Sequence, residues 1–288
     1  MRSTTSARVA GRARRAPAGT RHTSAQRRRA ADSPVMRGLA RAGLVARGII
    51  YLLIGLVAIL VALGRSSQQA DQQGALQLLA GKPYGLVALV LLGIGFAGYA
   101  LWRLGEAAFG VTGDGRGAGP RLKSLARAVI YAFFAFLTFE VIAGRAAGSQ
   151  TQKQQDVTAS VMQHAGGRWL VGIAGMIVVI CGLVLVMEGI RRKFMKYLNT
   201  AQMSRRTRKV VEILGVVGTI ARGVVFGIAG ILVLDAAATH NAGQSGGIDK
   251  ALLTLRAQPF GEFLLGLAAV GLLVFGIYGL CEARWRKV

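Results

Sequence analysis

The stretch "ARGIIYLLIG", residues 46–55, places one arginine directly before eight residues without a charge. The stretches "ARAVIYAFFA" at 126–135 and "ARGVVFGIAG" at 221–230 have the same form, and an aromatic residue follows each arginine by four positions. A cation at the border of an apolar segment is typical of a helix that enters a membrane from the aqueous side. The arginine therefore marks the start of a membrane-spanning segment.

The rest of the chain supports this interpretation. Of its 288 residues, 53% are hydrophobic and 40 are glycine, and the mean hydropathy is +0.47. A helix needs about 17–25 apolar residues to cross a bilayer, and the polar surface that a large soluble core requires is missing. We therefore predict an all-α integral membrane protein with six spans, at Gly48–Gly64, Tyr84–Trp102, Ala128–Gly144, Trp169–Met187, Gly223–Thr239 and Phe260–Cys281.

The positive charge is concentrated between alternate spans. Of the 36 Lys and Arg residues, 29 lie in 1–47, 103–127, 191–222 and 282–288. The positive-inside rule then predicts a multi-pass protein of the bacterial cell membrane with both termini in the cytoplasm. Because this topology accounts for the net charge of +24, we expect the lipid bilayer as a partner and no nucleic acid.

Residues 1–36 are rich in Arg, Ala, Ser and Thr and contain little that could be buried. Such a composition predicts a disordered basic tail on the cytoplasmic side. Its arginine clusters are suited to contact with anionic lipid, although a solvated tail that reinforces topology explains them as well. Met36 is an alternative start of the chain.

The three arginines also mark an internal repeat. Arg47, Arg127 and Arg222 are each followed, after 59, 61 and 60 residues, by an acid: Glu106, Glu188 and Glu282. We assign the repeats to 37–110, 121–195 and 212–286. Each contains two spans, so the three units are parallel, and we predict a pseudo-threefold arrangement about the membrane normal.

The segments between the two spans of a repeat are similar as well. "ALQLLAGKPYG" at 75–85 matches "ALLTLRAQPFG" at 251–261, whereas the middle copy, "QHAGGRWLVG" at 163–172, lacks the proline. Asp71, Asp156 and Asp249 precede mildly amphipathic stretches, in positions suited to an N-cap. We predict a short helix on the outer surface in each repeat.

Together, the three arginine motifs and the three glutamates resemble a family of bacterial membrane proteins, domain of unknown function 1206. Its members carry a two-helix repeat three times, and the resemblance spans about Arg37 to Arg286. It implies a topology and no activity, because the family has none to carry over.

The repeat suggests structural charge pairs. In an antiparallel hairpin, the start of the first helix and the end of the second lie at the same face, so each arginine can meet the glutamate of its own repeat. Pairing between neighbouring repeats, a functional relay and a lipid phosphate partner are alternatives. Within a hairpin the pairs would be Arg47 with Glu106, Arg127 with Glu188, and Arg222 with Glu282, and pairing between repeats is equally open.

Two further acids fall inside apolar spans. Glu140 and Asp235 each lie 13 residues after the arginine of their repeat, about 20 Å along a helix. They are candidate intramembrane acids for handling protons or cations. A protonated acid bonded to a neighbouring helix, or one that reaches the outer interface, is the alternative.

Enzyme and metal-site signatures are scarce. Ser and His residues lack a paired base, zinc spacing is absent, and Cys181 and Cys281 lie in apolar runs. We expect no catalytic residue, metal or cofactor. Two hypotheses of function follow: a compact structural or interaction protein of the membrane, favoured by its many helix glycines, or a small-solute or ion transporter that uses Glu140 and Asp235.

Overall fold

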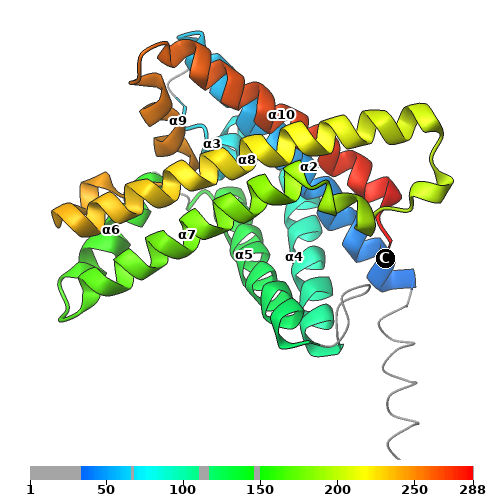
Figure 1. Cartoon of the computed structure of the whole chain (residues 1–288), viewed down its shortest axis with the longest axis horizontal. Coiled ribbons are helices and arrows are strands. Elements are labelled where there is room, and N and C mark those ends of the chain that lie inside the picture. The colour runs from blue at the N-terminus through cyan, green and yellow to red at the C-terminus, as the bar shows by residue number, and fades with distance from the viewer. Residues whose placement is uncertain (1–33, 66–67, 110–116, 146–149, 288) are drawn as a thin grey trace, which may run out of the picture.

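The structure is a computed structural model that describes residues 34–65, 68–109, 117–145 and 150–287 (Figure 1). Within these residues, one isolated bridge between Leu198 and Arg286 is the sole element that is not helical. Six helices are long and apolar enough to cross a membrane, as the sequence predicts. They are α2 (Pro34–Ala62), α4 (Gly85–Phe109), α5 (Ala118–Ile142), α7 (Gly167–Ile190), α8 (Arg205–Thr239) and α10 (Gly261–Trp285).

Several helices extend beyond the apolar runs of the sequence. Helix α8 begins at Arg205, where the Ser204 side chain caps it by accepting a hydrogen bond from the Thr207 amide. Helix α2 begins at Pro34, and proline is favoured in a first helical turn. The last three residues of the predicted tail are therefore helical, because the amphipathic flank of the span continues its helix. Residues 1–33 of that tail lie outside the described part of the chain.

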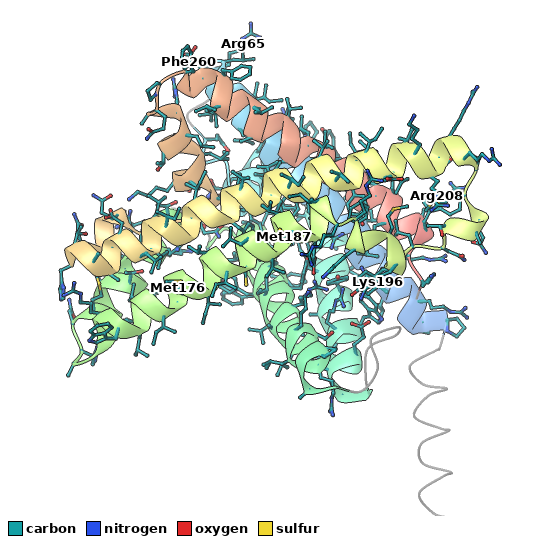
Figure 2. The ribbon with its side chains drawn as sticks, in the orientation of Figure 1. Arg65, Met176, Met187, Lys196, Arg208 and Phe260 are labelled. Atoms are coloured by element: carbon teal, nitrogen blue, oxygen red, sulfur yellow. The ribbon has the colours of Figure 1, made fainter. Side chains whose placement is uncertain are left out.

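The molecule has two ends with different connections. The short helices α3 (Gln72–Ala80), α6 (Gln150–Met162) and α9 (Ile248–Arg256) join the long helices of each repeat, as expected, and we name their end the short-helix face. The opposite end, the terminal face, carries both ends of the described chain and the 3-10 helices η1 (Lys193–Tyr197) and η2 (Thr200–Gln202). Figure 2 shows Arg65 and Phe260 at the first end and Lys196 and Arg208 near the second. All three repeats run in the same direction, while the pseudo-threefold axis stays a prediction.

The closest helix packing joins consecutive repeats and closes into a cycle. Helix α4 packs along α5, α7 along α8, and α10 along α2 (Figure 1). Within a repeat, α2 contacts α4 and α8 contacts α10, but less extensively. Helices α5 and α7 of repeat 2, which are described over their whole lengths, do not pack along each other. The second repeat is therefore held mainly by its neighbours.

Small residues at equivalent positions make these helix pairs close. In two of the three helix pairs, the glycine after the repeat arginine packs against the glycine that lies six positions before the glutamate of the neighbouring repeat. A Cβ on Gly276 would lie 2.9 Å from the carbonyl oxygen of Gly48, and one on Gly182 would lie 2.8 Å from that of Gly223. The third pair has buried Ala128 and Ala100 at these positions. Small residues let helix backbones approach where apolar burial does not drive association.

The three aspartates between the long helices of the repeats have different roles. Asp71 caps α3, since its side chain accepts a hydrogen bond from the Gly74 amide, as predicted. Asp156 lies inside α6, and Asp249 is the second residue of α9, so both predicted caps are wrong. The helix around Asp156 begins at Gln150, seven residues earlier than the cap prediction requires. Asp249 instead contacts repeat 1.

Candidate functional site

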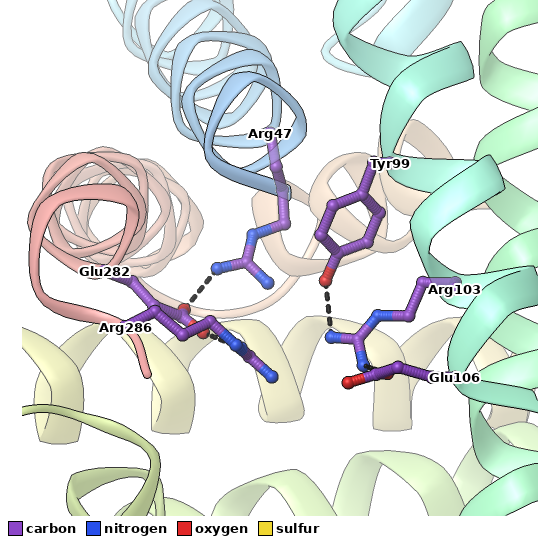
Figure 3. A network of polar contacts seen from close by, with 6 residues as sticks. All are labelled: Arg47, Tyr99, Arg103, Glu106, Glu282 and Arg286. Atoms are coloured by element: carbon purple, nitrogen blue, oxygen red, sulfur yellow. Dashed lines mark hydrogen bonds and ion pairs between the residues drawn. The ribbon is translucent and has the colours of Figure 1, made fainter. Parts of the chain in front are cut away.

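A network of charged side chains lies between α2, α4 and α10 toward the terminal face (Figure 3). We name it the charged cluster. Burial of several ions in a membrane-spanning bundle costs free energy and is a default sign of a functional or specifying site. Its members are Arg47, Tyr99, Arg103, Glu106, Glu282 and Arg286.

Glu282 joins two guanidinium groups. Its carboxylate accepts hydrogen bonds from Arg47 on α2 and from Arg286, four residues further along its own chain. The side chains of Arg47 and Glu282 are 10% and 7% exposed. A buried, charge-assisted pair of this kind fixes α2 against α10, and so ties repeat 1 to repeat 3.

Glu106 is held by α4 and α5. Arg103 donates to the Glu106 carboxylate at 2.5 Å and to the hydroxyl of Tyr99 at 2.6 Å. The Ser124 hydroxyl of α5 also donates to the Glu106 carboxylate, at 3.1 Å. The Arg103 guanidinium also lies 4.3 Å from the ring centroid of Trp102. Arg103 is 1% exposed, so this polar group is fixed within the protein.

The predicted pairs within hairpins are replaced by other contacts. Arg47 pairs with Glu282 of the neighbouring repeat instead of Glu106. Glu188 accepts from Lys123 at 3.0 Å instead of from Arg127. For Arg47 the reason is the packing order, because the start of α2 lies beside α10, the second long helix of repeat 3. The alternative of pairing between repeats holds for Arg47 alone.

Arg222 and Arg127 have no carboxylate within ion-pair distance among the described residues. The Arg222 guanidinium lies about 5 Å from the ring centroids of Tyr51, Phe226 and Phe275. Such cation–π contacts replace part of the lost hydration. Arg127 is half-buried, and its nearest charged neighbours include other arginines.

The region as a whole carries more cations than anions. A half-buried guanidinium without a counterion is unfavourable in a medium of low dielectric constant. The arrangement therefore creates a positive potential toward the terminal face, suited to attracting an anion. The five guanidiniums are those of Arg47, Arg103, Arg127, Arg222 and Arg286, and the two buried carboxylates are those of Glu106 and Glu282.

Sequence reasoning missed Arg103, Arg286 and Lys123. A usable signal existed for two of them. Arg103 lies three residues before Glu106, and Arg286 lies four after Glu282, so each shares a helix face with its glutamate. Lys123 has no comparable signal, since its partner Glu188 is 65 residues away.

The candidate intramembrane acids lie near the short-helix face. Glu140 is two residues from the end of α5 and lies 3.5 Å from Arg145. Asp235 is exposed near the end of α8, and its charge acts on Lys250 of α9. The pKa of Lys250 is lowered by partial burial, which the nearby Asp235 opposes. Both acids therefore lie near the ends of their helices that lead to the short-helix face, and each has a cation close by.

Two other carboxyls meet on the short-helix face. Asp249 of α9 accepts a hydrogen bond from the Ala70 amide at 2.8 Å, directly before the Asp71 cap. Burial raises the pKa of Asp71 to about 6, the Gly74 amide opposes this shift, and the negative charge of Asp249 adds to it. Burial also raises the pKa of Asp249. This contact links repeats 1 and 3 at the opposite end from the charged cluster.

The described residues lack a cluster of metal ligands and a disulfide. They contain no group of three His, Cys, Asp or Glu side chains that could hold a metal ion. Cys181 is exposed and Cys281 is half-buried, and both are free thiols.

Comparison with known proteins matches the three repeats. The model of the family "Domain of Unknown Function (DUF1206)" matches residues 42–110, 122–192 and 217–286. An uncharacterized protein of Bacillus subtilis (strain 168), YxxB, is 31% identical over 258 residues, which cover 88% of this chain and 93% of that protein. No solved structure matches. The chain belongs to the DUF1206 family, whose two-helix unit it carries three times.

Proposed function

We propose that this chain is a compact, non-enzymatic protein that acts as a structural or interaction component of the membrane. The observation that supports this role is the packing of aromatic rings within and beside the charged cluster. Aromatic rings from different repeats meet there, with centroids 4.4 Å apart for Tyr99 and Tyr131 and 4.7 Å apart for Tyr51 and Phe275. Interlocked rings and close helix backbones favour a fixed assembly over a pathway for solute.

The charge distribution supports an orientation in the bacterial cell membrane. The terminal face carries the Lys and Arg clusters of 191–222 and of the chain end, and cations of this kind are retained in the cytoplasm. We propose that this face is cytoplasmic and that the basic tail, 1–36, contacts anionic lipid beside it.

Cysteine labelling tests the role and the orientation together. Cys181 and Cys281 are first replaced by serine, and Ala269→Cys then reports on the interior of α10, where Ala269 is 0% exposed. A membrane-impermeant thiol reagent should leave this cysteine unmodified from either side. In the same background, exposed Thr239→Cys should react from outside the cell and exposed Lys193→Cys only after access to the cytoplasm.

Transport through Glu140 and Asp235 stays the alternative hypothesis. Their positions beside Arg145 and Lys250 give it no particular support. Reaction of Ala269→Cys from both sides, with the two exposed controls still labelled from one side each, would reveal an aqueous path and replace the proposed role with transport.

A further inference from the structure

A small polar pocket opens beside the charged cluster at the seam between α5 and α7. Its lining includes Arg103, Lys123, Arg127, Glu188, Tyr197 and Arg286. The free volume is about 40 Å³, which is room for about three water molecules. Four of these six side chains are cations, and the single carboxylate is already bound by Lys123.

The backbone around the pocket is held in place. The bridge between Leu198 and Arg286 is accompanied by a hydrogen bond from the Asn199 amide to the Trp285 carbonyl, at 2.8 Å. A second bond, 3.0 Å long, runs from the Lys287 amide to the Tyr197 carbonyl. The end of the described chain is thus fastened to η1, and the Tyr197 and Arg286 side chains extend from a fixed support.

The cations of the pocket lack sufficient counterions. Arg127 makes no hydrogen bond or ion pair with any described residue, although Arg47, Arg103 and Arg286 lie near enough to repel it. Arg103 is 1% exposed, and its Nε is buried without a hydrogen-bond partner in the described chain. A cation that is removed from water without a counterion is costly. An anion in the pocket would remove that cost.

Phosphate is the anion that this arrangement favours. A guanidinium offers a planar pair of N–H donors that matches two phosphate oxygens, and lysine supplies a point charge. Here Arg127 provides the free pair of donors and Arg286 and Lys123 provide adjacent charge.

The surroundings of the pocket allow a lipid to reach it. Helices α5 and α7 do not pack along each other, so the bundle is not closed by helix contacts at this seam. Apolar side chains flank it on both helices near the terminal face, and they are 42–68% exposed: Leu122 and Leu125 on α5, and Met187 and Ile190 on α7. Acyl chains of a lipid whose headgroup occupies the pocket would lie against them.

We propose that this pocket binds a phosphate group, with Arg127 as its main ligand, and that the phosphate belongs to a lipid headgroup or to a soluble phosphate. The site goes beyond the proposed function: it can bind phosphate whether or not the interior of the bundle excludes water. The labelling of Ala269→Cys and the binding test below therefore fail independently.

The test measures the thermal unfolding midpoint of the purified full chain in detergent. One titration adds phosphatidylglycerol, with phosphatidylcholine as the uncharged reference, and the other adds inorganic phosphate, with chloride at equal ionic strength. We expect a saturable rise of several degrees with one of the two phosphate sources. Arg127→Gln should weaken that binding about tenfold or more, whereas Arg191→Gln, the same change at an exposed position on the same face, should leave it unchanged.

The two titrations also identify the source. A response to phosphatidylglycerol alone assigns the site to a lipid headgroup, and a response to inorganic phosphate assigns it to a soluble phosphate. Without either ligand, Arg127→Gln should unfold at the wild-type temperature or above it, because it removes an uncompensated charge. A lower midpoint, or the absence of any Arg127-dependent response to both probes, would overturn the proposal.

Discussion

Two regions of the molecule contain the repeated arginine motif but are packed differently. They are the junction between repeats 1 and 3 and the seam between α5 and α7 within repeat 2. At the junction, α2 and α10 approach through Gly48 and Gly276, and Glu282 neutralises Arg47. At the seam, α5 and α7 do not pack, and an exposed Lys123–Glu188 pair crosses between them. The repeat thus fixes where a charge lies along its helix, while the tightness of the helix pair decides whether that charge acquires a buried partner.

Removal of the carboxylate at the junction should have the largest effect. Glu282→Gln leaves Arg47 and Arg286 without their shared counterion in a buried site. Loss of one partner of a buried ion pair costs about 3–5 kcal/mol. Reversible unfolding in mixed micelles measures the change, and a loss below about 1 kcal/mol would contradict the buried pairing.

A methyl group at the junction should have the next largest effect. In Gly276→Ala the new Cβ would lie 2.8 Å from the Leu52 amide nitrogen and 2.9 Å from the Gly48 carbonyl oxygen. Separation of the helices should cost about 1–3 kcal/mol. Gly172→Ala on α7 is the matched control, since its Cβ would meet only the Ala237 side chain, at 3.8 Å. Equal stability of the two variants would show that α2 and α10 are not closely packed.

The short-helix face supplies a pH-dependent comparison. The pKa of Asp71 is about 6 in the folded chain, against 3.8 for an ordinary aspartate, so the folded protein binds this proton more tightly than the unfolded one. Stability should therefore rise as the pH falls from about 6 to about 4, by about 1–3 kcal/mol. Unfolding measured across this range reports the effect.

Asp71→Asn should weaken this dependence, because the amide oxygen still accepts from Gly74 while this titrating group is gone. The raised pKa of Asp249 leaves a smaller dependence of the same sign. Asp156→Asn changes the equivalent exposed acid of repeat 2 and should leave the pH profile unchanged. A wild-type profile that persists in Asp71→Asn would assign the titration to another group.

The ion pair at the seam should contribute least. The side chains of Lys123 and Glu188 are 53% and 29% exposed, and exposed pairs contribute less than about 1 kcal/mol. Glu188→Gln, the counterpart of Glu282→Gln, should therefore barely change the unfolding free energy. A loss as large as that of Glu282→Gln would mean that the seam is closed in the membrane.

The helices and the repeat could be predicted from sequence, because a span needs a long apolar segment with internally bonded backbone groups. The partners of the charges could not. Arg47 lies at the end of the bundle where the glutamates lie, whether it pairs within its hairpin or with a neighbouring repeat. The spacing of about 60 residues between each arginine and the glutamate of its repeat therefore fits both arrangements. Glycine positions such as Gly48 and Gly276 could have favoured the neighbouring helix, but only once the packing order was known.

Other differences have local causes. Asp249 precedes an amphipathic stretch, as a cap does, but its carboxylate is used by the Ala70 amide of repeat 1. Glu140 and Asp235 each lie 13 residues after the arginine of their repeat. Helices α5 and α8, however, begin well before those arginines. Because α5 ends at Ile142 and α8 ends at Thr239, both acids lie within a few residues of the helix end at the short-helix face.

A double-mutant cycle at Arg47 tests the central claim, that the buried charges join repeat 1 to repeat 3. Unfolding free energies are measured for Arg47→Gln, Glu282→Gln and their combination, and again with Glu106→Gln in place of Glu282→Gln. The structure predicts a coupling energy for Arg47 with Glu282 that exceeds the coupling with Glu106 by more than about 1 kcal/mol. An equal or stronger coupling with Glu106 would contradict it and restore the pairing within the hairpin.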